Sequence, residues 1–275
     1  MKHSIFFQFQ TMLLVTFILC LSGCQSDGWS SVQNSETHYL KSKYTNSNYR
    51  INVWYPEGYQ SSEDYHAVYL LDGDDYFREV AEYLTGVGRE DIVLIGIGYK
   101  GDNQRGRDFS YPEDDDFPND SGGAKQYIQF LNHELIPFIE KDLNLNSIDN
   151  TLFGHSLGGY LSLYLLYQQE YENPFDYHIA ASPNIMWYRH YLFELEDDFY
   201  RMEQVITQNI YVTVGDLEGV ALNTSFDAFQ NLLESRDYKT TVAFERLPNT
   251  THRNSPIQSF IKGIALFFNT KVIAK

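Results

Sequence analysis

The chain has 275 residues, of which 43% are hydrophobic and 21% charged, a composition typical of a globular protein that can bury a sizeable core. Its formal net charge of −17 argues against nucleic acid as a partner, because phosphate binding requires a basic surface. Both cysteines, Cys20 and Cys24, lie in the first 24 residues, which excludes a disulfide, a cysteine-ligated metal and a thiol nucleophile from the rest of the chain.

The first 24 residues predict a signal peptide. A positive start at Met1-Lys2-His3 precedes a mostly apolar run from Phe6 to Leu21. The run ends in Leu21-Ser22-Gly23-Cys24, which resembles the lipobox of bacterial lipoproteins, in which the cysteine is lipidated and becomes the mature N-terminus. An uncleaved single-span anchor is the alternative, but the run is short for spanning a bilayer and contains Gln8 and Gln10.

The leader predicts where the protein acts. We expect Cys24 to carry a lipid that anchors the chain to a membrane of the bacterial cell envelope, with the folded part facing the periplasm or the exterior. Residues 25–36 are mostly polar and serine-rich, which indicates a flexible tether. Residues 37–275 are expected to form one domain, because no internal repeat or second core is visible.

The domain begins with strand patterns. Residues 38–44 and 49–55 alternate between apolar and polar positions around the turn formers Asn46-Ser47-Asn48, which predicts an antiparallel hairpin at a sheet edge. Residues 67–71 and 92–97 are continuous apolar runs, as expected for parallel strands buried on both faces.

A segment without periodicity follows at residues 101–122. It contains Arg105, Arg107 and the acidic run Glu113-Asp114-Asp115-Asp116. Its length suggests a functional or mobile loop, and a solvated surface loop is the simpler interpretation of the acids. The acids, even with Asp120, lack the ligand spacing of a metal loop, and no metal or cofactor is expected.

Beyond this loop, helix and strand patterns alternate, which predicts a mainly parallel central sheet with helices on both faces. Apolar residues recur with helical spacing over 123–143, where Pro137 is expected to introduce a kink. The remaining predicted elements are strands at 151–153, 177–180, 209–214 and 240–247, and helices at 157–169, 221–235 and 255–268.

The segment Gly154-His155-Ser156-Leu157-Gly158 matches the Gly-x-Ser-x-Gly nucleophile elbow of the α/β-hydrolase fold. The pentapeptide alone is weak evidence, because it recurs by chance in chains of this size. Its context is stronger, since an apolar strand precedes it and a helical pattern follows it. The elbow makes Ser156 the candidate nucleophile. The N–H of Leu157, at a helix N-terminus, is a candidate oxyanion donor.

A serine nucleophile needs a base, and in this fold the order along the chain is serine, acid, histidine. Three histidines follow Ser156. His178 lies in an apolar strand and is expected to be a core histidine, while His190 lies in an aromatic stretch. His252 lies in a polar loop between the last strand and the last helix, which makes it the preferred base.

The acid should follow the strand that ends at Val214. Asp216 and Glu218 are both candidates there, Asp227 is a more distant one, and the residue pattern does not choose between Asp216 and Glu218.

A second oxyanion donor should follow an early central strand. Leu71-Asp72-Gly73-Asp74 fits, because Gly73 permits a kink that can direct the N–H of Asp74 inward.

These motifs together resemble the Putative esterase family of α/β-hydrolases, which includes esterase D, the enterobactin-type siderophore trilactone esterases and the mycolyltransferases. The resemblance covers roughly residues 37–270. Its motifs are Tyr69-Leu70-Leu71-Asp72-Gly73, Arg107-Asp108, Gly154-His155-Ser156-Leu157-Gly158-Gly159, Ala181-Ser182-Pro183, Gly215-Asp216-Leu217-Glu218 and His252.

The resemblance implies a role for each matching residue. Ser156 would be the nucleophile, His252 the base and Glu218 the acid. The N–H groups of Asp74 and Leu157 would form the oxyanion hole, and Arg107 would lie near the substrate entrance. The siderophore-esterase branch often has a tryptophan pair after Ser-Pro, whereas this chain has Asn184-Ile185-Met186-Trp187-Tyr188.

We therefore expect a serine carboxylic ester hydrolase that acts through an acyl-enzyme on a small ester, with a siderophore trilactone as the preferred substrate. An acyltransferase of the same fold is one alternative. A non-catalytic lipoprotein that binds a ligand is the other, and the complete set of Ser156, Glu218 and His252 speaks against it.

Overall fold

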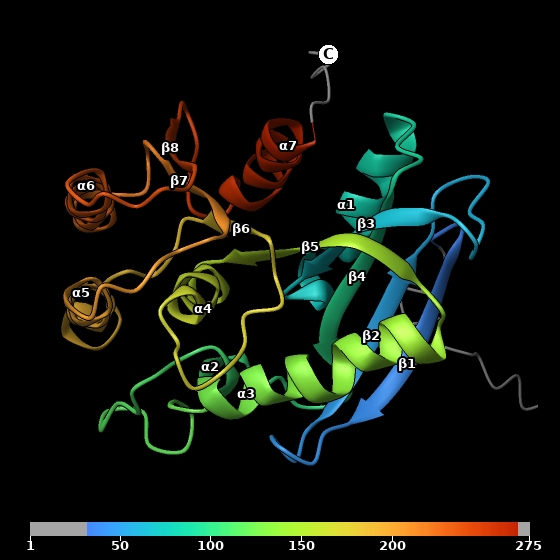
Figure 1. Ribbon diagram of the computed structural model, residues 1–275, viewed down its shortest axis with the longest axis horizontal. Coiled ribbons are helices and arrows are strands. Elements are labelled where there is room, and N and C mark those ends of the chain that lie inside the picture. Colours follow the sequence, from blue (N-terminus) through green and yellow to red (C-terminus); the bar gives the residue numbers. More distant parts are fainter. Residues whose placement is uncertain (1–31, 269–275) are drawn as a thin grey trace, which may run out of the picture.

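Eight strands form one sheet with the order β1-β2-β4-β3-β5-β6-β7-β8 in the computed structural model, which describes residues 32–268 (Figure 1). The antiparallel pairs β1–β2 and β2–β4 lie at one edge, and every other pair is parallel. The strands are β1 (Ser35–Lys41), β2 (Asn48–Trp54), β3 (Asp64–Leu70), β4 (Ile92–Tyr99), β5 (Asn146–His155), β6 (Tyr177–Ala181), β7 (Asn209–Gly215) and β8 (Val242–Leu247).

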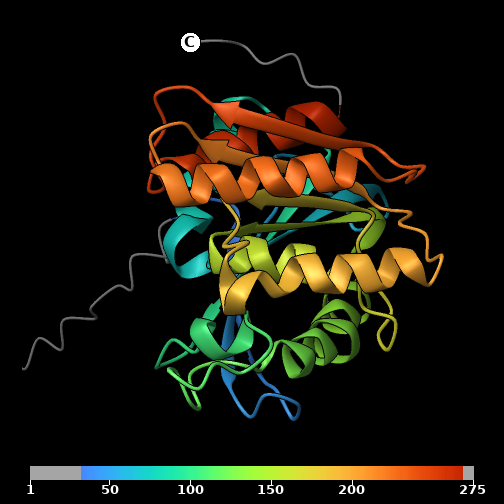
Figure 2. The same cartoon turned by 90° about the vertical axis from the view of Figure 1, so that its left-hand side faces the viewer.

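The parallel strands are buried because helices cover both faces of the sheet. Figure 1 shows α1 and α7 on one face and α3, α4, α5 and α6 on the other. In Figure 2, α5 and α6 run side by side, and Phe193 of α5 contacts Phe229 of α6 with the ring centroids 5.6 Å apart. The helices are α1 (Gly73–Gly86), α2 (Arg105–Asp108), α3 (Ala124–Phe130), α4 (Leu157–Leu166), α5 (Trp187–Arg201), α6 (Val220–Glu234) and α7 (Ser255–Phe267).

Two hydrophobic cores result, one on each side of the sheet. The smaller core joins Phe77 of α1 and Phe260 of α7 to sheet residues such as Phe153. The larger core joins α3, α4, α5 and α6 to the opposite face. α4 lies within that core and all of its residues are buried, which explains why its sequence is apolar on every side.

The predicted hairpin, parallel strands and alternating helices are confirmed, with their ends displaced by a few residues. β1 begins at Ser35, two residues before the predicted start of the domain. The helix predicted over 123–143 is α3 followed by two π-helical segments, Leu131–Leu135 and Phe138–Asp142. Pro137 lies between these segments, where its missing N–H removes a helical hydrogen bond.

Two helices, α1 and α5, are not predicted by the sequence patterns, and neither is α2, which forms a single turn within residues 101–122. The signal peptide, Cys24 and the tether up to residue 31 lie outside the described residues. Within residues 32–268, no helix is both long and apolar enough to cross a bilayer.

The topology brings the loops that follow β3, β5, β6, β7 and β8 to one edge of the sheet, because parallel strands end at the same side. These loops and the helix starts that follow them carry four predicted site residues, Asp74, Ser156, Glu218 and His252, and also Ser182. The fold therefore gathers these residues from across about 180 positions of sequence.

His178 is the core histidine that the sequence predicts. It is fully buried in β6, where its Nδ1 lies 3.0 Å from Ser162 Oγ and its Nε2 lies 3.0 Å from the amide nitrogen of Asn173. Burial lowers the pKa of His178 to about 3, and the hydrogen bond with Ser162 opposes this only in part. The imidazole is therefore neutral in the folded protein near pH 7.

This burial predicts an acid sensitivity of folding. Between the unfolded pKa of about 6.5 and the folded value, only the unfolded chain binds a proton at His178, so this residue lowers stability as the pH falls, by up to ~1.4 kcal/mol per pH unit. His178→Gln should make the decline shallower by that slope in urea unfolding between about pH 4 and pH 7. Parallel stability curves for the two proteins would contradict the prediction.

Candidate active site

Ser156 occupies a sharp turn between β5 and α4. Its backbone angles, φ 57° and ψ −115°, are ones that non-glycine residues rarely adopt. Three backbone hydrogen bonds hold this conformation: the Ser156 N–H donates to Ala181 O at 3.0 Å, and the Ser156 carbonyl accepts from Tyr160 N at 3.0 Å and Asn184 N at 2.9 Å. Hydrogen bonds with β6, α4 and the chain after β6 thus hold both the N–H and the carbonyl group of the strained serine.

The glycines of the motif allow the chain to fold back on itself. A Cβ atom on Gly154 would lie 2.2 Å from the carbonyl oxygen of Gly158, so any side chain there would push α4 away from β5. A Cβ on Gly159 would lie 3.1 Å from Pro183. The elbow therefore needs glycine for close backbone approach.

His252 and Glu218 form a hydrogen-bonded pair beside the elbow. His252 Nδ1 lies 2.7 Å from Glu218 Oε2, and the His252 ring lies 4.5 Å, centroid to centroid, from the ring of His155, the neighbour of Ser156. The Glu218 side chain is fully buried, whereas the His252 side chain is 40% exposed. A carboxylate in this position holds the imidazole with its proton on Nδ1 and leaves Nε2 available as a base.

The second carboxylate oxygen of Glu218 is also bound. Its Oε1 accepts from Ser182 Oγ at 2.5 Å and from the N–H of Gly215 at 2.6 Å. Burial alone raises the pKa of Glu218, but the hydrogen bonds from His252, Ser182 and Gly215 outweigh it and hold the pKa below its ordinary value. Glu218 is therefore ionised at neutral pH.

The other two candidate acids have different partners. Asp216 is exposed, and its Oδ1 accepts from the backbone N–H of Thr250 at 3.1 Å, so it ties the His252 loop to β7. Asp227 is 57% exposed on α6 and pairs with Arg246. His190, the remaining alternative base, is exposed on α5 and contacts Ser225 on α6.

The two predicted oxyanion donors begin neighbouring helices. Leu157 is the first residue of α4 and Asp74 the second residue of α1, and N–H groups in a first helical turn have no partner within the helix. The two helix starts adjoin, because a Cβ on Gly158 would lie 3.4 Å from Asp72 Oδ2. The Asp74 carboxylate points elsewhere, to Arg50 at 2.5 Å and to the N–H of Tyr99 at 2.7 Å.

Arg105, not Arg107, contacts this part of the site. Arg105 binds the buried carboxylate of Asp72 through Nε at 2.7 Å and Nη2 at 3.0 Å, and its Nη2 lies 3.5 Å from the carbonyl oxygen of His155. It thus joins the residue before α1 to the elbow. The resemblance pointed to Arg107, and no signal in the sequence distinguished the two arginines.

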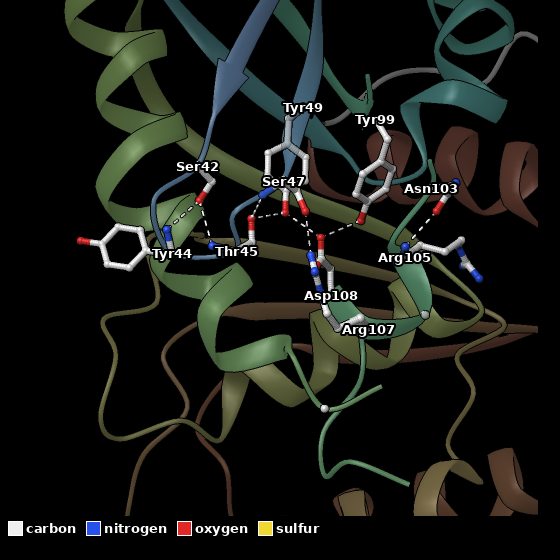
Figure 3. A network of polar contacts seen from close by, with 12 residues as sticks. Ser42, Tyr44, Thr45, Ser47, Tyr49, Tyr99, Asn103, Arg105, Arg107 and Asp108 are labelled. Carbon is white, nitrogen blue, oxygen red and sulfur yellow. Dashed lines mark hydrogen bonds and ion pairs between the residues drawn. The ribbon is translucent and has the colours of Figure 1, made fainter. Parts of the chain in front are cut away.

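Figure 3 shows where Arg107 lies. Its guanidinium donates to Asp108 Oδ1 and to Ser47 Oγ, and the buried Asp108 also accepts from the hydroxyl groups of Tyr49 and Tyr99. The Arg105 side chain points away from this cluster. Arg107 therefore attaches α2 to the turn before β2, and its partner Asp108 attaches α2 to β2 and β4. The role of Arg107 toward a substrate stays a prediction.

A groove of about 500 Å³ adjoins the elbow through Asn184, whose N–H binds the Ser156 carbonyl. The acidic run of the 101–122 loop forms one wall, and the start of α5 forms the other. Its lining residues are Asp114, Asp115, Asp116, Phe117, Asn184, Met186, Trp187, Tyr188 and Arg189. Within the described residues, no group of three or more histidines and carboxylates is arranged to hold a metal ion.

Comparison with known proteins identifies the family of the chain. The model of the family described as Putative esterase matches residues 42–260. The chain therefore belongs to that family, and it is a serine esterase, a carboxylic ester hydrolase with the α/β-hydrolase fold.

The alignments with individual relatives cover between about half and three quarters of each relative's own length. The ferri-bacillibactin esterase BesA of Bacillus subtilis is 28% identical over 211 residues, which cover 68% of this chain and 72% of BesA. The siderophore enterobactin esterase of Emericella nidulans is 31% identical over 166 residues, 50% of this chain and 54% of that protein. The crystal structure of the BES protein from Bacillus cereus superposes with a TM-score of 0.71 at 25% identity, covering 84% and 94% of the two chains.

The geometry predicts which carboxylate supports the base. Glu218→Gln should lower kcat roughly ten-thousand-fold, because an uncharged amide neither fixes the His252 tautomer nor stabilises an imidazolium. Asp216→Asn is the matched control and should stay close to wild type, since asparagine keeps the oxygen that accepts from Thr250. The measurement is kcat on a chromogenic aryl ester, and the opposite order of the two variants would refute the assignment.

Proposed function

We propose that this protein cleaves the ester bonds of a cyclic siderophore trilactone or a related small ester, with Ser156 as nucleophile, His252 as base and Glu218 as the supporting acid. The observation that carries the roles is the 2.7 Å contact of His252 with the buried Glu218, beside a serine held in a strained turn. The relatives named for siderophore esterase activity support the substrate class.

In the proposed reaction, Ser156 Oγ attacks the ester carbonyl carbon while His252 Nε2 takes the hydroxyl proton. The N–H groups of Leu157 and Asp74 would stabilise the oxyanion that forms on the carbonyl oxygen. Collapse breaks the bond to the alcohol oxygen, which receives the proton from His252, and leaves the acyl group on Ser156. Water then attacks the acyl carbon while His252 takes one of its protons. Collapse breaks the bond to Ser156 Oγ, which receives that proton from His252, and the carboxylic acid leaves.

Glu218 is suited to this cycle because its negative charge persists at neutral pH. The imidazolium that forms in both steps is attracted to the buried carboxylate, while Ser182 and Gly215 prevent that carboxylate from turning away. The reaction needs no cofactor, since nucleophile, base and oxyanion donors all come from the chain.

The groove beside the elbow bears on the form of the substrate. The aromatic side chains of Trp187, Tyr188 and Phe117 could stack on planar rings of a substrate, whereas Asp114–Asp116 repel a negatively charged substrate. A ferric complex of a catecholate trilactone is an anion, and the iron-free molecule carries less negative charge. We therefore infer a preference for the iron-free form.

The substrate test uses a panel of the iron-free and ferric forms of a cyclic trilactone, short aryl esters and acetylated sugars, with products identified by mass spectrometry. The iron-free trilactone should gain one water per cleaved ester and react faster than the ferric form. Raising the salt concentration should bring the two reaction rates closer together, because salt screens the negative charge of the acidic groove. Products joined to an added acceptor alcohol would indicate acyl transfer instead.

Two controls separate the outcomes. Ser156→Ala should abolish every activity and prevent labelling by a fluorophosphonate. Ser156-dependent hydrolysis of aryl esters with an intact trilactone would refute the substrate and keep the esterase. Failure of the folded wild type to label would refute the role of Ser156 and favour a ligand-binding protein.

We further propose that Cys24 carries a lipid anchor and that the enzyme acts in the bacterial cell envelope. The support is the apolar run followed by Leu21-Ser22-Gly23-Cys24. A tether of polar residues before β1 would let the domain reach a substrate near the membrane surface.

Fractionation of cells tests the anchor. The full chain should sediment with membranes and incorporate labelled fatty acid, whereas Cys24→Ala should lose the label. Cys20→Ala is the matched control, because that cysteine lies inside the apolar run and should keep the label. Equal labelling of the two variants would contradict the proposal.

A further inference from the structure

His155, the residue before Ser156, makes two specific side-chain contacts. Its Nε2 lies 2.9 Å from the backbone carbonyl oxygen of His252, and its Nδ1 lies 3.0 Å from the hydroxyl group of Tyr76 on α1. His155 is only 6% exposed at the end of β5. Its side chain thus joins three segments that are distant in sequence.

These contacts determine the tautomer. A carbonyl oxygen can only accept, so Nε2 carries the proton and donates it to His252. Nδ1 is then the acceptor, and the Tyr76 hydroxyl donates to it. Burial, helped by the nearby His252, lowers the pKa of His155 to about 4, and burial raises the pKa of Tyr76 to about 12, so both groups are neutral near pH 7.

His252 is thereby held at two points. Its imidazole is bound by Glu218, and its main-chain carbonyl accepts from His155 Nε2 and from Ser255 Oγ at 3.1 Å. Without the second attachment, the loop could shift while the imidazole stayed on Glu218. The direction of Nε2 relative to Ser156 would then be less well defined.

We propose that His155 and Tyr76 are positioning residues, which hold the main chain of the base over the nucleophile elbow. Tyr76 selects the His155 tautomer that donates to the His252 carbonyl. This inference rests on the proposed role of His252 in the reaction. The contact between Tyr76 and His155 also connects the base to the start of α1, because Tyr76 lies two residues after Asp74, the proposed oxyanion donor.

The decisive comparison is His155→Leu against His155→Gln. Leucine fills the buried space but cannot donate, whereas the glutamine amide nitrogen can occupy the position of Nε2. We expect His155→Leu to lower kcat about tenfold to a hundredfold with KM unchanged, because the base is misplaced and no substrate contact is lost. His155→Gln should recover most of this loss, although both variants should melt at similar temperatures.

Tyr76→Phe tests the tautomer. It removes the donor to Nδ1 and should lower kcat roughly two- to tenfold, the range expected for one hydrogen bond. In the His155→Leu background the same change should have no further effect, because no tautomer remains to be selected. Tyr83→Phe, seven residues further along α1, is the matched control and should leave kcat unchanged.

Each outcome decides the inference. Equal kcat values for His155→Leu and wild type would overturn it, as would equal losses in the leucine and glutamine variants, which would indicate packing alone. Additive losses in the double variant would overturn the role of Tyr76. Wild-type enzyme that neither hydrolyses aryl esters nor labels with fluorophosphonate would instead overturn the proposed function.

Discussion

The strained backbone of Ser156 is the constraint on which the rest of the site depends. A residue in this conformation persists only where its neighbours over-determine it, and here the hydrogen bonds to Ala181, Tyr160 and Asn184 do so. They require β6 to lie directly beside β5, and they require the chain after β6 to turn back toward the elbow. The contact between Gly154 and Gly158 fixes the distance from β5 to α4. The conformation of Ser156 thus depends on the relative positions of β5, β6 and α4.

Buried carboxylates then attach the surrounding loops to this elbow. Asp72 binds Arg105, Asp108 binds Arg107 with two tyrosines, and Glu218 binds His252 with Ser182. Removing one partner from such a group leaves an uncompensated buried charge, which costs about 3–5 kcal/mol, so each carboxylate also specifies where its loop must lie.

The sequence predicted the fold class because apolar runs and turn-forming residues are local patterns. It predicted the elbow because the glycines around Ser156 are required by contacts within the same short segment. The helix α1 was not predicted although Phe77, Val80, Ala81 and Leu84 have helical spacing, because the segment after the strand was interpreted only as a turn at Asp72-Gly73. The residue pattern left Asp216 and Glu218 open and only the family resemblance favoured Glu218, because the contact with His252 depends on where β8 and the His252 loop pack. For the same reason Arg105, Tyr76 and His155 received no role, because their partners lie 33 to 97 residues away in sequence.

The chain order of the sheet has a consequence for when activity can arise during folding. Glu218 follows β7 and His252 follows β8, so the pair can form only after the parallel strands from β5 to β8 have aligned and α7 has docked. Contacts of this long sequence separation form slowly. With the roles proposed for Ser156 and His252, a chain in which β8 has not yet joined the sheet holds its nucleophile without its base, so ester cleavage would report the completion of the C-terminal part of the fold rather than the formation of the elbow.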